Sequence, residues 1–360
     1  MNYKILNFKL SNNIKDLINK LASEHSLEPE DYLKLIQDAS PEDDLYLAEL
    51  AVKARYKIYK NFVYVRGLIE ISNICKNNCY YCGIRRDNQN CERYRLMPEQ
   101  ILECACEGYR LGFRTFVMQG GEDLFFTDEI LCRIIKDIKN KFPDCAVTLS
   151  LGERSYESYK ILREAGADRY LLRHETADKT HYNKLHPAEM SYDNRIKCLY
   201  NLRELNYQVG CGFMINSPFQ TLNNIAQDLK FIENFKPEMC GIGPFIPHHD
   251  TEFKDLKIKP GTLELTCRLL SIIRLIHPAI LLPATTALGT IHPQGRELGI
   301  KAGANVVMPN LSPVSVRRKY ELYDNKICTG EESAQCLNCL EARMRSIGYE
   351  IVSARGDFKN

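Results

Sequence analysis

Short apolar runs alternate with amphipathic stretches along most of this chain. The stretch at 129–142 is the clearest helix, because Ile130, Ile134, Ile135 and Ile138 fall on one face. Strands that alternate with helices are typical of a parallel sheet with crossover helices, and eight strands close a (β/α) barrel. We therefore predict an α/β fold, a (β/α)8 TIM-type barrel, although short runs also fit an open doubly wound sheet. The eight runs are residues 63–71, 115–119, 146–151, 169–173, 208–215, 240–245, 281–285 and 305–308.

The ends of the chain follow a different pattern from the middle. Residues 12–58 are expected to be helical, and Ser40 followed by Pro41 is typical of a helix start. We expect an N-terminal helical extension at 1–60, the barrel at 61–310 and a C-terminal extension at 311–360. Within the barrel, the similar phrases at 164–168 and 301–305 each end a helix with glycine before the next strand begins.

Composition narrows the class of protein. The chain has 360 residues, with 48 basic against 46 acidic side chains, so it offers no overall field for nucleic acid. Its most apolar stretch, 269–284, is interrupted by Arg274, His277 and Pro278, so no membrane span is expected. Fifteen cysteines and a start without the apolar core of a signal peptide favour a reducing cytoplasm.

Three cysteines stand at C-x3-C-x2-C spacing directly after the first apolar run. Cys75, Cys79 and Cys82 can converge on one 4Fe–4S cube, which leaves one iron without a protein ligand and open to a small molecule. Structural zinc is less well matched, because the loop holds no fourth Cys or His and Cys91 comes nine residues later. A disulfide framework is disfavoured by the odd cysteine count in a long chain. We predict a catalytic cluster.

Other polar groups are expected at the carboxyl ends of the strands, where chemistry takes place in such barrels. Gly120, Gly121 and Glu122 follow the second run and could bring backbone and a carboxylate close to a ligand; a plain βα turn is the simpler alternative. The sixth run offers backbone beside Gly241 and Gly243, which suits recognition of an adenine.

Charged residues cluster at the end of the fourth run. Arg169, Arg173 and Glu175 alternate along one strand, so all three point to the same side; if that side is the lumen of a barrel, their charges lie in its interior. Buried charges of this kind are costly unless they are paired or bind something. A structural ion-pair layer would explain them, but we prefer an anionic ligand. Arg195 is a further candidate, for a carboxylate.

A second group of cysteines lies near the C-terminus at C-x7-C-x2-C spacing: Cys328, Cys336 and Cys339. Three cysteines in a polar loop could bind a 2Fe–2S cluster with an outside ligand, or zinc, or nothing. The spacing indicates a metal-capable loop without naming the metal.

With both cysteine groups placed, the chain resembles the HydE family of radical S-adenosylmethionine (SAM) maturases of FeFe-hydrogenases, in the group that also contains biotin synthase and methylornithine synthase. The resemblance covers residues 63–340. Asn216 to Thr221 departs from it, because relatives have a Gly-Leu-Pro-Gly-Gln-Thr type turn there. The phrases that carry it are CKNNCYYCGIRRDN, GGED, TLSLGE, GADRYLLRHET, GIGPFIPHHDT, PATTALGTI, GANVVMPN and the final cysteines.

The resemblance implies a role for each matching residue. Cys75, Cys79 and Cys82 hold the catalytic 4Fe–4S cluster, and Cys328, Cys336 and Cys339 hold an accessory cluster (2Fe–2S or 4Fe–4S) that family members can lack. The SAM contacts are Gln119, Gly121, Glu122, Thr148, Glu175, Arg195, Met239 and Ile242. The substrate and anion end of the cavity is lined by Arg66, Arg169, Arg173, Thr285, Thr286 and Tyr320.

The same resemblance implies a reaction. The reduced cluster passes one electron to SAM, which breaks into methionine and a 5′-deoxyadenosyl radical. That radical acts on a small organometallic substrate, a cysteine-bound iron dicarbonyl cyanide, during assembly of the diiron subcluster of the hydrogenase H-cluster. Sister maturases and a reductant such as flavodoxin or ferredoxin are the expected partners. The alternatives are a methylornithine synthase-like mutase, another biotin synthase-like radical SAM enzyme, or a non-catalytic metal-binding assembly scaffold.

Overall fold

The computed structural model describes residues 12–330 and 337–359. Six strands form its main sheet, in the order β2-β3-β4-β5-β6-β8, and every neighbouring pair is parallel. The strands are β2 (Gly67–Ser72), β3 (Thr115–Gly120), β4 (Ala146–Ser150), β5 (Arg169–Leu171), β6 (Gln208–Cys211) and β8 (Met239–Cys240). The prediction of an α/β fold with parallel strands is confirmed.

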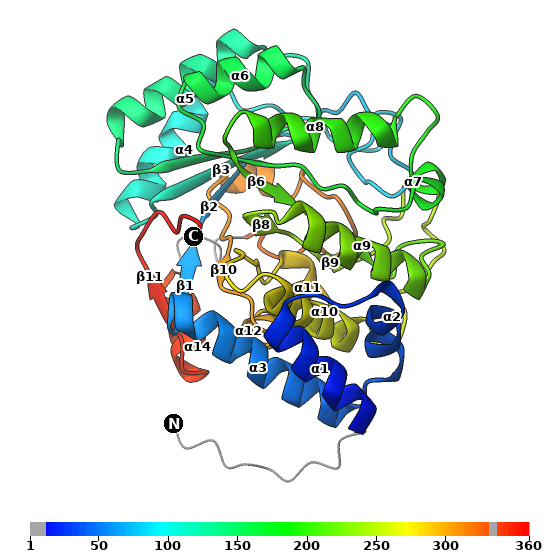
Figure 1. The fold of residues 1–360 in the computed structure, drawn as a ribbon. Helices are drawn as coiled ribbons and strands as arrows, with labels where there is room; N and C mark the ends of the chain where they lie inside the picture. Colours follow the sequence, from blue (N-terminus) through cyan, green and yellow to red (C-terminus); the bar gives the residue numbers. More distant parts are fainter. Residues whose placement is uncertain (1–11, 331–336, 360) are drawn as a thin grey trace.

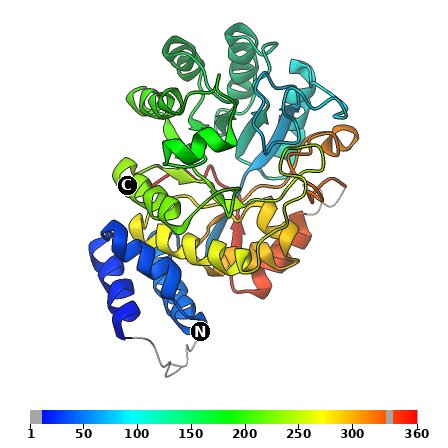
Figure 2. The ribbon, with the colours of Figure 1, turned by 90° about the vertical axis from the view of Figure 1, so that its right-hand side faces the viewer.

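Helices connect these strands and cover the outer face of the sheet (Figures 1 and 2). The helices α4, α5 and α6 follow β2, β3 and β4, as expected for crossover connections. Their bounds are α4 (Pro98–Arg110), α5 (Asp128–Lys141), α6 (Tyr156–Glu164), α7 (Lys179–Leu185), α8 (Tyr192–Glu204), α9 (Leu222–Phe235), α10 (Thr262–Ile276), α11 (Thr286–Ile291), α12 (Gly295–Lys301), α13 (Val314–Arg317) and α14 (Leu337–Ser346).

Two smaller sheets complete the strands. In the first, β1 (Phe62–Val65) lies between β10 (Val306–Val307) and β11 (Glu350–Val352). A strand from the first part of the chain thus pairs with two strands from its last part. In the second, β7 (Met214–Ile215) pairs with β9 (Gly243–Pro244). Isolated parallel bridges also join Met239 to Leu281, Pro283 to Val306 and Leu68 to Asn310.

One predicted strand is much weaker than expected. The run at 281–285 makes only single bridges at Leu281 and Pro283, and Thr285 already caps helix α11. Proline has no backbone N–H, so residue 283 cannot donate to a ladder. The apolar character of this run reflects burial of Leu281 and Leu282, which are fully buried, rather than a regular strand.

The N-terminal helices are built as the sequence predicts. Helix α3 (Pro41–Tyr59) begins with a capping box, in which the Ser40 side chain accepts from the Asp43 N–H and the Asp43 carboxylate accepts from the Ser40 N–H. It follows α1 (Asn12–Glu24) and α2 (Pro29–Asp38), and Figure 1 shows the three helices together beside α9 and α10. Their apolar faces join the same hydrophobic core as the main sheet.

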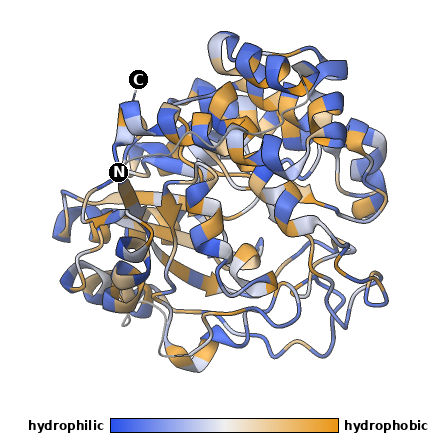
Figure 3. Cartoon of the chain, turned by 90° about the horizontal axis from the view of Figure 1, so that it is seen from below, coloured by the Kyte–Doolittle hydropathy of each residue, from blue (hydrophilic) through white to orange (hydrophobic). Residues whose placement is uncertain are grey.

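Hydropathy follows this layering. In Figure 3 the strands are mainly hydrophobic, while hydrophilic residues dominate the outward faces of the surrounding helices. The helix-ending glycines in the two similar phrases take left-handed backbone angles, with φ of 114° at Gly166 and 104° at Gly303, as predicted for these turns. Among the described residues, no helix is long and apolar enough to cross a membrane.

Candidate active site

The three cysteines of the first motif lie in the loop that leaves β2. All three thiols are partly buried, and burial raises their pKa values, that of Cys82 to about 12; for Cys79 and Cys82 the charge of neighbouring thiols adds to this. All three belong to one short loop, residues 75–82. Clustered thiols of this kind become thiolates only beside a strong positive charge, which suits them to bind iron.

A single arginine holds the two ends of this loop together. The guanidinium of Arg93 donates to the carbonyls of Asn73 at 2.7 Å, Ile84 at 2.9 Å and Arg85 at 2.6 Å. Carbonyl oxygens before and after the three cysteines are thus held by one side chain. The loop has little regular secondary structure, and these contacts define its shape.

The Gly-Gly-Glu segment at the end of β3 packs directly on the cysteine loop. A Cβ at Gly121 would collide with the Ile74 backbone and approach Cys75, so only glycine fits. The Glu122 N–H lies 3.4 Å from Cys75 Sγ, and the Lys76 N–H donates to the Glu122 carbonyl at 3.1 Å. The Gly-Gly-Glu segment therefore lies close enough to the cysteine loop to contact a ligand bound there, as its functional interpretation requires.

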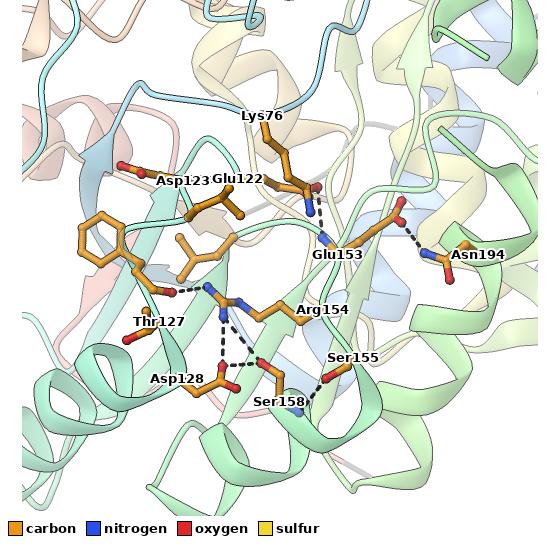
Figure 4. Close-up of a pocket in the computed structure, with 13 residues that line it drawn as sticks. Lys76, Glu122, Asp123, Thr127, Asp128, Glu153, Arg154, Ser155, Ser158 and Asn194 are labelled. Atoms are coloured by element: carbon orange, nitrogen blue, oxygen red, sulfur yellow. Dashed lines mark hydrogen bonds and ion pairs between the residues drawn. The ribbon is translucent and has the colours of Figure 1, made fainter. Parts of the chain in front are cut away.

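The Glu122 carboxylate is itself held in place. It accepts from the Glu153 N–H at 3.0 Å and pairs with Lys76 Nζ at 3.0 Å. Glu153 in turn binds Arg195 Nε at 2.5 Å and Asn194 Nδ2 at 2.5 Å. Figure 4 shows Lys76, Glu122, Glu153 and Asn194 lining a cavity of about 610 Å³. The ends of β3 and β4 and the first turn of α8 therefore meet in one polar network beside Cys75.

Several buried polar atoms have no hydrogen-bond partner among the described residues. They include Thr148 Oγ1, Glu175 Oε2, and nitrogen atoms of Arg173 and Arg66. Arg173 Nη2 lies 3.2 Å from Glu175 Oε2, without the geometry of a hydrogen bond. Buried donors and acceptors left unpaired are costly, so this set fits a polar ligand. Hydroxyl, carboxylate and guanidinium groups together suit the ammonium, carboxylate and ribose of SAM.

The fourth run does not have the geometry predicted for its charged residues. Strand β5 ends at Leu171, and Glu175 has a φ of 65°, so Arg169, Arg173 and Glu175 do not alternate along one strand. The three residues after Leu171 have no regular secondary structure, although the Leu172 N–H still donates to the Gly210 carbonyl. Glu175 forms a parallel bridge with Phe213.

Arg169 lies at the start of β5 and is fully buried. Its guanidinium pairs with Asp357 at 2.5 Å and donates to Gln208 Oε1 at 3.1 Å and Thr115 Oγ1 at 3.1 Å. The charge therefore has a protein partner from the C-terminal segment, 188 residues away in the chain.

The remaining predicted residues lie around the interior of the main sheet. Arg66, between β1 and β2, reaches Met239 Sδ on β8 at 3.0 Å. Gln119 Nε2 donates to the Tyr320 hydroxyl at 3.3 Å. Ile242 is buried, Thr285 accepts from the Leu288 N–H as the cap of α11, and Thr286 begins that helix.

The second cysteine group is only partly within the described residues. Cys328 has a φ of 66°, and its Sγ accepts from Arg296 Nη2 at 2.9 Å. Cys339 is exposed on α14. Cys336 lies outside the described residues, so the predicted accessory cluster stays a prediction.

Some site residues were not predicted from the sequence. Glu153 ends the TLSLGE phrase, which could have indicated it, and Lys76 stands inside the cysteine motif. Met190 gave no signal, yet its Sδ lies 3.6 Å from Cys79 Sγ. The same is true of Asp357, because nothing local in the chain links it to Arg169.

Among the described residues, the group of potential metal ligands whose atoms all lie within 4.8 Å of one another is His248, His249 and Asp324, and the thiols of Cys75, Cys79 and Cys82 are spaced more widely. Three of the four ring nitrogens already have protein partners. His249 Nδ1 bonds Asp324 at 2.6 Å, its Nε2 lies 3.3 Å from Asp250, and His248 Nδ1 accepts from the Asp250 N–H. The group ties the strand-end loop at 248–250 to the C-terminal region rather than presenting free ligands.

Comparison with known proteins places this site in a class. Residues 69–232, which include the cysteine loop and the Gly-Gly-Glu segment, match the radical SAM superfamily. The fold agrees, because the solved structure of a methylornithine synthase superposes with a TM-score of 0.78 at 23% identity over 93% of this chain and 97% of its own. The protein is a radical SAM enzyme, and its family implies a 4Fe–4S cluster and SAM as cofactors.

The particular family follows from sequence. The [FeFe] hydrogenase maturase subunit HydE of Thermotoga maritima is 44% identical over 302 residues, which cover 84% of this chain and 85% of that protein. This chain belongs to the HydE family of radical SAM enzymes. A 3-methylornithine synthase of Methanosarcina acetivorans is more distant, at 27% identity over 92% of each chain. The solved structure of HydG, another maturase of the [FeFe]-hydrogenase, shares the fold with a TM-score of 0.78 at 20% identity over 96% of this chain and 77% of its own.

Proposed function

We propose that this enzyme acts in assembly of the diiron subcluster of the FeFe-hydrogenase H-cluster, on a cysteine-bound iron dicarbonyl cyanide complex. The observation that carries the proposal is the contact of the Gly-Gly-Glu segment with the cysteine loop, where the Glu122 N–H lies 3.4 Å from Cys75 Sγ, in a chain 44% identical to a HydE. Sister maturases would supply the complex and use the product, and a flavodoxin or ferredoxin in the cytoplasm would supply electrons.

In this proposal the three thiolates hold the 4Fe–4S cluster and leave one iron for SAM. Cluster and SAM together supply a one-electron cleavage that yields methionine and a 5′-deoxyadenosyl radical. The chain contributes binding, orientation and the exclusion of water. Thiols whose pKa values are raised by burial lose their protons when iron binds.

The SAM end is assigned to residues around the cysteine loop. Glu122, with Gly121 giving close access, would receive the ammonium, and Arg195 the carboxylate. Arg195 would exchange part of its contact with Glu153 to do so. Thr148 and Glu175 offer unpartnered oxygen atoms for the ribose and ammonium. Gln119, Met239 and Ile242 would complete the wall of the nucleoside site.

The opposite end of the cavity is assigned to the substrate. Arg66 and Arg173 carry buried, unpartnered guanidinium nitrogens and would neutralise an anionic iron complex. Thr285, Thr286 and Tyr320 would line the same space. Arg169 stays in the proposed set, with its charge shared with Asp357, so we expect it to contribute less to binding than Arg66 does.

The finer architecture is also part of the proposal. The bridges at Leu281, Pro283 and Asn310 lie between β8 and β2, the ends of the main sheet, and support a closed eight-membered barrel over residues 61–310. Residues 1–60 would then be a helical extension and 311–360 a C-terminal one. Cys328, Cys336 and Cys339 would hold an accessory 2Fe–2S or 4Fe–4S cluster that activity does not require.

The proposal is tested by anaerobic reconstitution with iron and sulfide, followed by SAM cleavage under dithionite. Wild-type protein should form 5′-deoxyadenosine, and with the iron complex and sister maturases it should activate a diiron hydrogenase. Cys79→Ser should lose both activities, because two thiolates cannot retain the cluster. Cys132→Ser, a partly buried cysteine on α5 away from the loop, is the matched control and should keep both.

Each rival function has a distinct outcome in the same assay. A mutase like methylornithine synthase would rearrange lysine and would not support hydrogenase activation. A scaffold would bind metal without cleaving SAM. If Cys79→Ser activates the hydrogenase as well as wild type does, activation requires only binding of metal or partner, and the enzymatic proposal is overturned.

A further inference from the structure

A buried ion pair links the C-terminal region to β2, the first strand of the main sheet. Lys326 Nζ lies 2.5 Å from Glu70 Oε1, and the two side chains are 7% and 1% exposed. Lys326 stands two residues before Cys328, and Glu70 lies in the middle of β2, five residues before Cys75. The sequence analysis assigned no role to either residue.

Both charges have further partners. The second Glu70 oxygen accepts from Asn310 Nδ2 at 2.8 Å. Lys326 Nζ donates to the Tyr320 carbonyl at 2.8 Å and also lies 4.8 Å from the centroid of the Tyr320 ring. One ammonium group therefore holds both the backbone and the aromatic ring of Tyr320.

The pair faces the same interior as the predicted site. Glu70 of β2 is in register with Gln119 of β3, and Gln119 donates to the Tyr320 hydroxyl. Side chains at paired positions of neighbouring strands lie on the same face of a sheet. Glu70, Gln119, Tyr320 and Lys326 thus form one polar layer beneath the cysteine loop. Burial, and after it the Glu70 charge, raises the pKa of the Tyr320 phenol, so its hydroxyl keeps its proton at neutral pH.

Stability alone does not account for such a pair. The cost of removing two charges from water often equals or exceeds their attraction, and apolar residues of similar size usually stabilise a core as well. A buried pair is instead well suited to fixing the position of what it contacts. Here the contacted group is Tyr320, a residue that we assign to the substrate end of the cavity.

We propose that Lys326, held by Glu70, is a positioning residue that sets Tyr320 against Gln119 at the wall of the reaction cavity and so places the substrate for the radical. This inference rests on the proposed function, since it assigns a role at that same cavity. It also means that the segment leading to Cys328 is fastened to β2, whatever the second cysteine group binds.

The test replaces the pair without leaving a buried charge. Lys326→Met with Glu70→Gln removes both charges at similar volume, so the holoenzyme should fold. The matched control is Arg268→Met with Asp44→Asn, which removes a partly buried pair between α10 and α3 at 2.6 Å, away from the cavity. Iron content, substrate-free SAM cleavage and the KM for the cysteine-bound iron dicarbonyl cyanide complex are measured for each.

The double variant Lys326→Met with Glu70→Gln, called the cavity variant below, should keep its iron content and its substrate-free SAM cleavage. Its KM for the iron complex should rise about 10-fold to 100-fold, the effect of a small misplacement of the substrate. The control should keep all three. An unchanged KM in the cavity variant would overturn the proposal, and so would loss of the cluster or of SAM cleavage, since the pair would then serve the fold. Wild-type protein that does not turn over the complex would instead refute the proposed function.

A second measurement keeps the inference testable without any substrate. Hydrogen exchange of residues 320–330 in the holoenzyme should be faster in the cavity variant than in wild type, because the Tyr320 carbonyl loses its ammonium partner. Equal exchange in the two proteins would contradict the fastening role of Lys326.

Discussion

Gly152 shows how one residue sets the shape of the proposed SAM site. It has a φ of 73°, and a Cβ there would collide with the side chain of Glu122. Glycine is thus required twice, for the backbone angle and for the space. The next residue, Glu153, then donates its N–H to the Glu122 carboxylate. The position of Glu122 depends on a residue with no functional group of its own.

Replacement of this glycine should weaken SAM binding. Gly152→Ala should lose about 1 kcal/mol of stability from the left-handed backbone and should raise the Kd for SAM at least about tenfold, by displacing Glu122. Gly261→Ala is the matched control, because its φ is 77° and its Cβ would meet nothing within 4 Å. Isothermal titration of the reconstituted proteins with SAM compares them. Equal Kd values for the two variants would contradict the role of Gly152.

Phe219 keeps a backbone angle that its side chain disfavours. It stands in the segment where relatives have a glycine-containing turn, and both Phe219, at 64°, and Asn216, at 56°, have positive φ. The segment therefore places a bulky residue at a left-handed position.

The strain at Phe219 can be measured by comparing two truncations. Phe219→Ala removes the exposed ring but keeps the Cβ, whereas Phe219→Gly removes both. The glycine variant should be more stable than the alanine variant by about 1 kcal/mol, in spite of the greater chain entropy of glycine. Urea unfolding gives the two free energies. An alanine variant of equal or greater stability would show that this turn is not strained.

At the scale of single residues, the sequence predicted those features of the site that depend on residues close together in the chain. The cysteine loop and the Gly-Gly-Glu segment are local motifs, and the structure brings them together beside Cys75. The partner of Arg169 could not be predicted, because Asp357 is far away in sequence and an ion pair needs no local pattern. The alternative interpretation of these charges, a structural ion-pair layer, describes Arg169 better than a site for an anionic ligand does.

The sequence predicted which helices and strands form better than it predicted where each one begins and ends. The helices at 12–58 and 129–142 and the parallel strands follow directly from periodicity and caps. The run at 281–285 failed as a strand because burial of Leu281 and Leu282 alone makes it apolar, and β5 ends at Leu171, before the left-handed backbone of Glu175. Apolar runs report burial, and they report hydrogen bonding only indirectly.

The C-terminal segment is an element that no pattern predicted. Residues 353–359 cross the starts of several strands, where Arg355 pairs with Asp168 at 2.9 Å and its carbonyl accepts from Thr115 and Arg169. Asp357 pairs with both arginines. Burial alone would raise the pKa of Asp357, but the hydrogen bond from Arg355 and the charge of Arg169 lower it to about 2.

This shift predicts a pH dependence of stability. Because the folded pKa lies below the unfolded value, about 3.9, the stabilisation by Asp357 is fully present above pH 4 and is lost as the pH falls towards 2. The gap in unfolding free energy between wild type and Asp357→Asn, measured in urea on cluster-free protein, should close over that range. Asp31→Asn, which removes a surface pair with Lys20, should show a much smaller gap. A gap for Asp357→Asn that does not change with pH would contradict the assignment.

The molecule as a whole joins these parts around one interior. The cysteine loop and the strand-end segments meet at the carboxyl ends of the strands, the place expected for chemistry in this architecture. The C-terminal segment lies across the opposite ends. Buried atoms of Arg66, Arg173 and Glu175 have no hydrogen-bond partner among the described residues, which the strand pattern did not predict.

The central claim is that three thiolates hold a cubane whose fourth iron binds SAM. Electron paramagnetic resonance of anaerobically reconstituted, dithionite-reduced protein, recorded with and without SAM, tests it most directly. The account predicts a 4Fe–4S signal that changes when SAM is added. A protein without a cubane signal, or with one that SAM leaves unaltered, would contradict it.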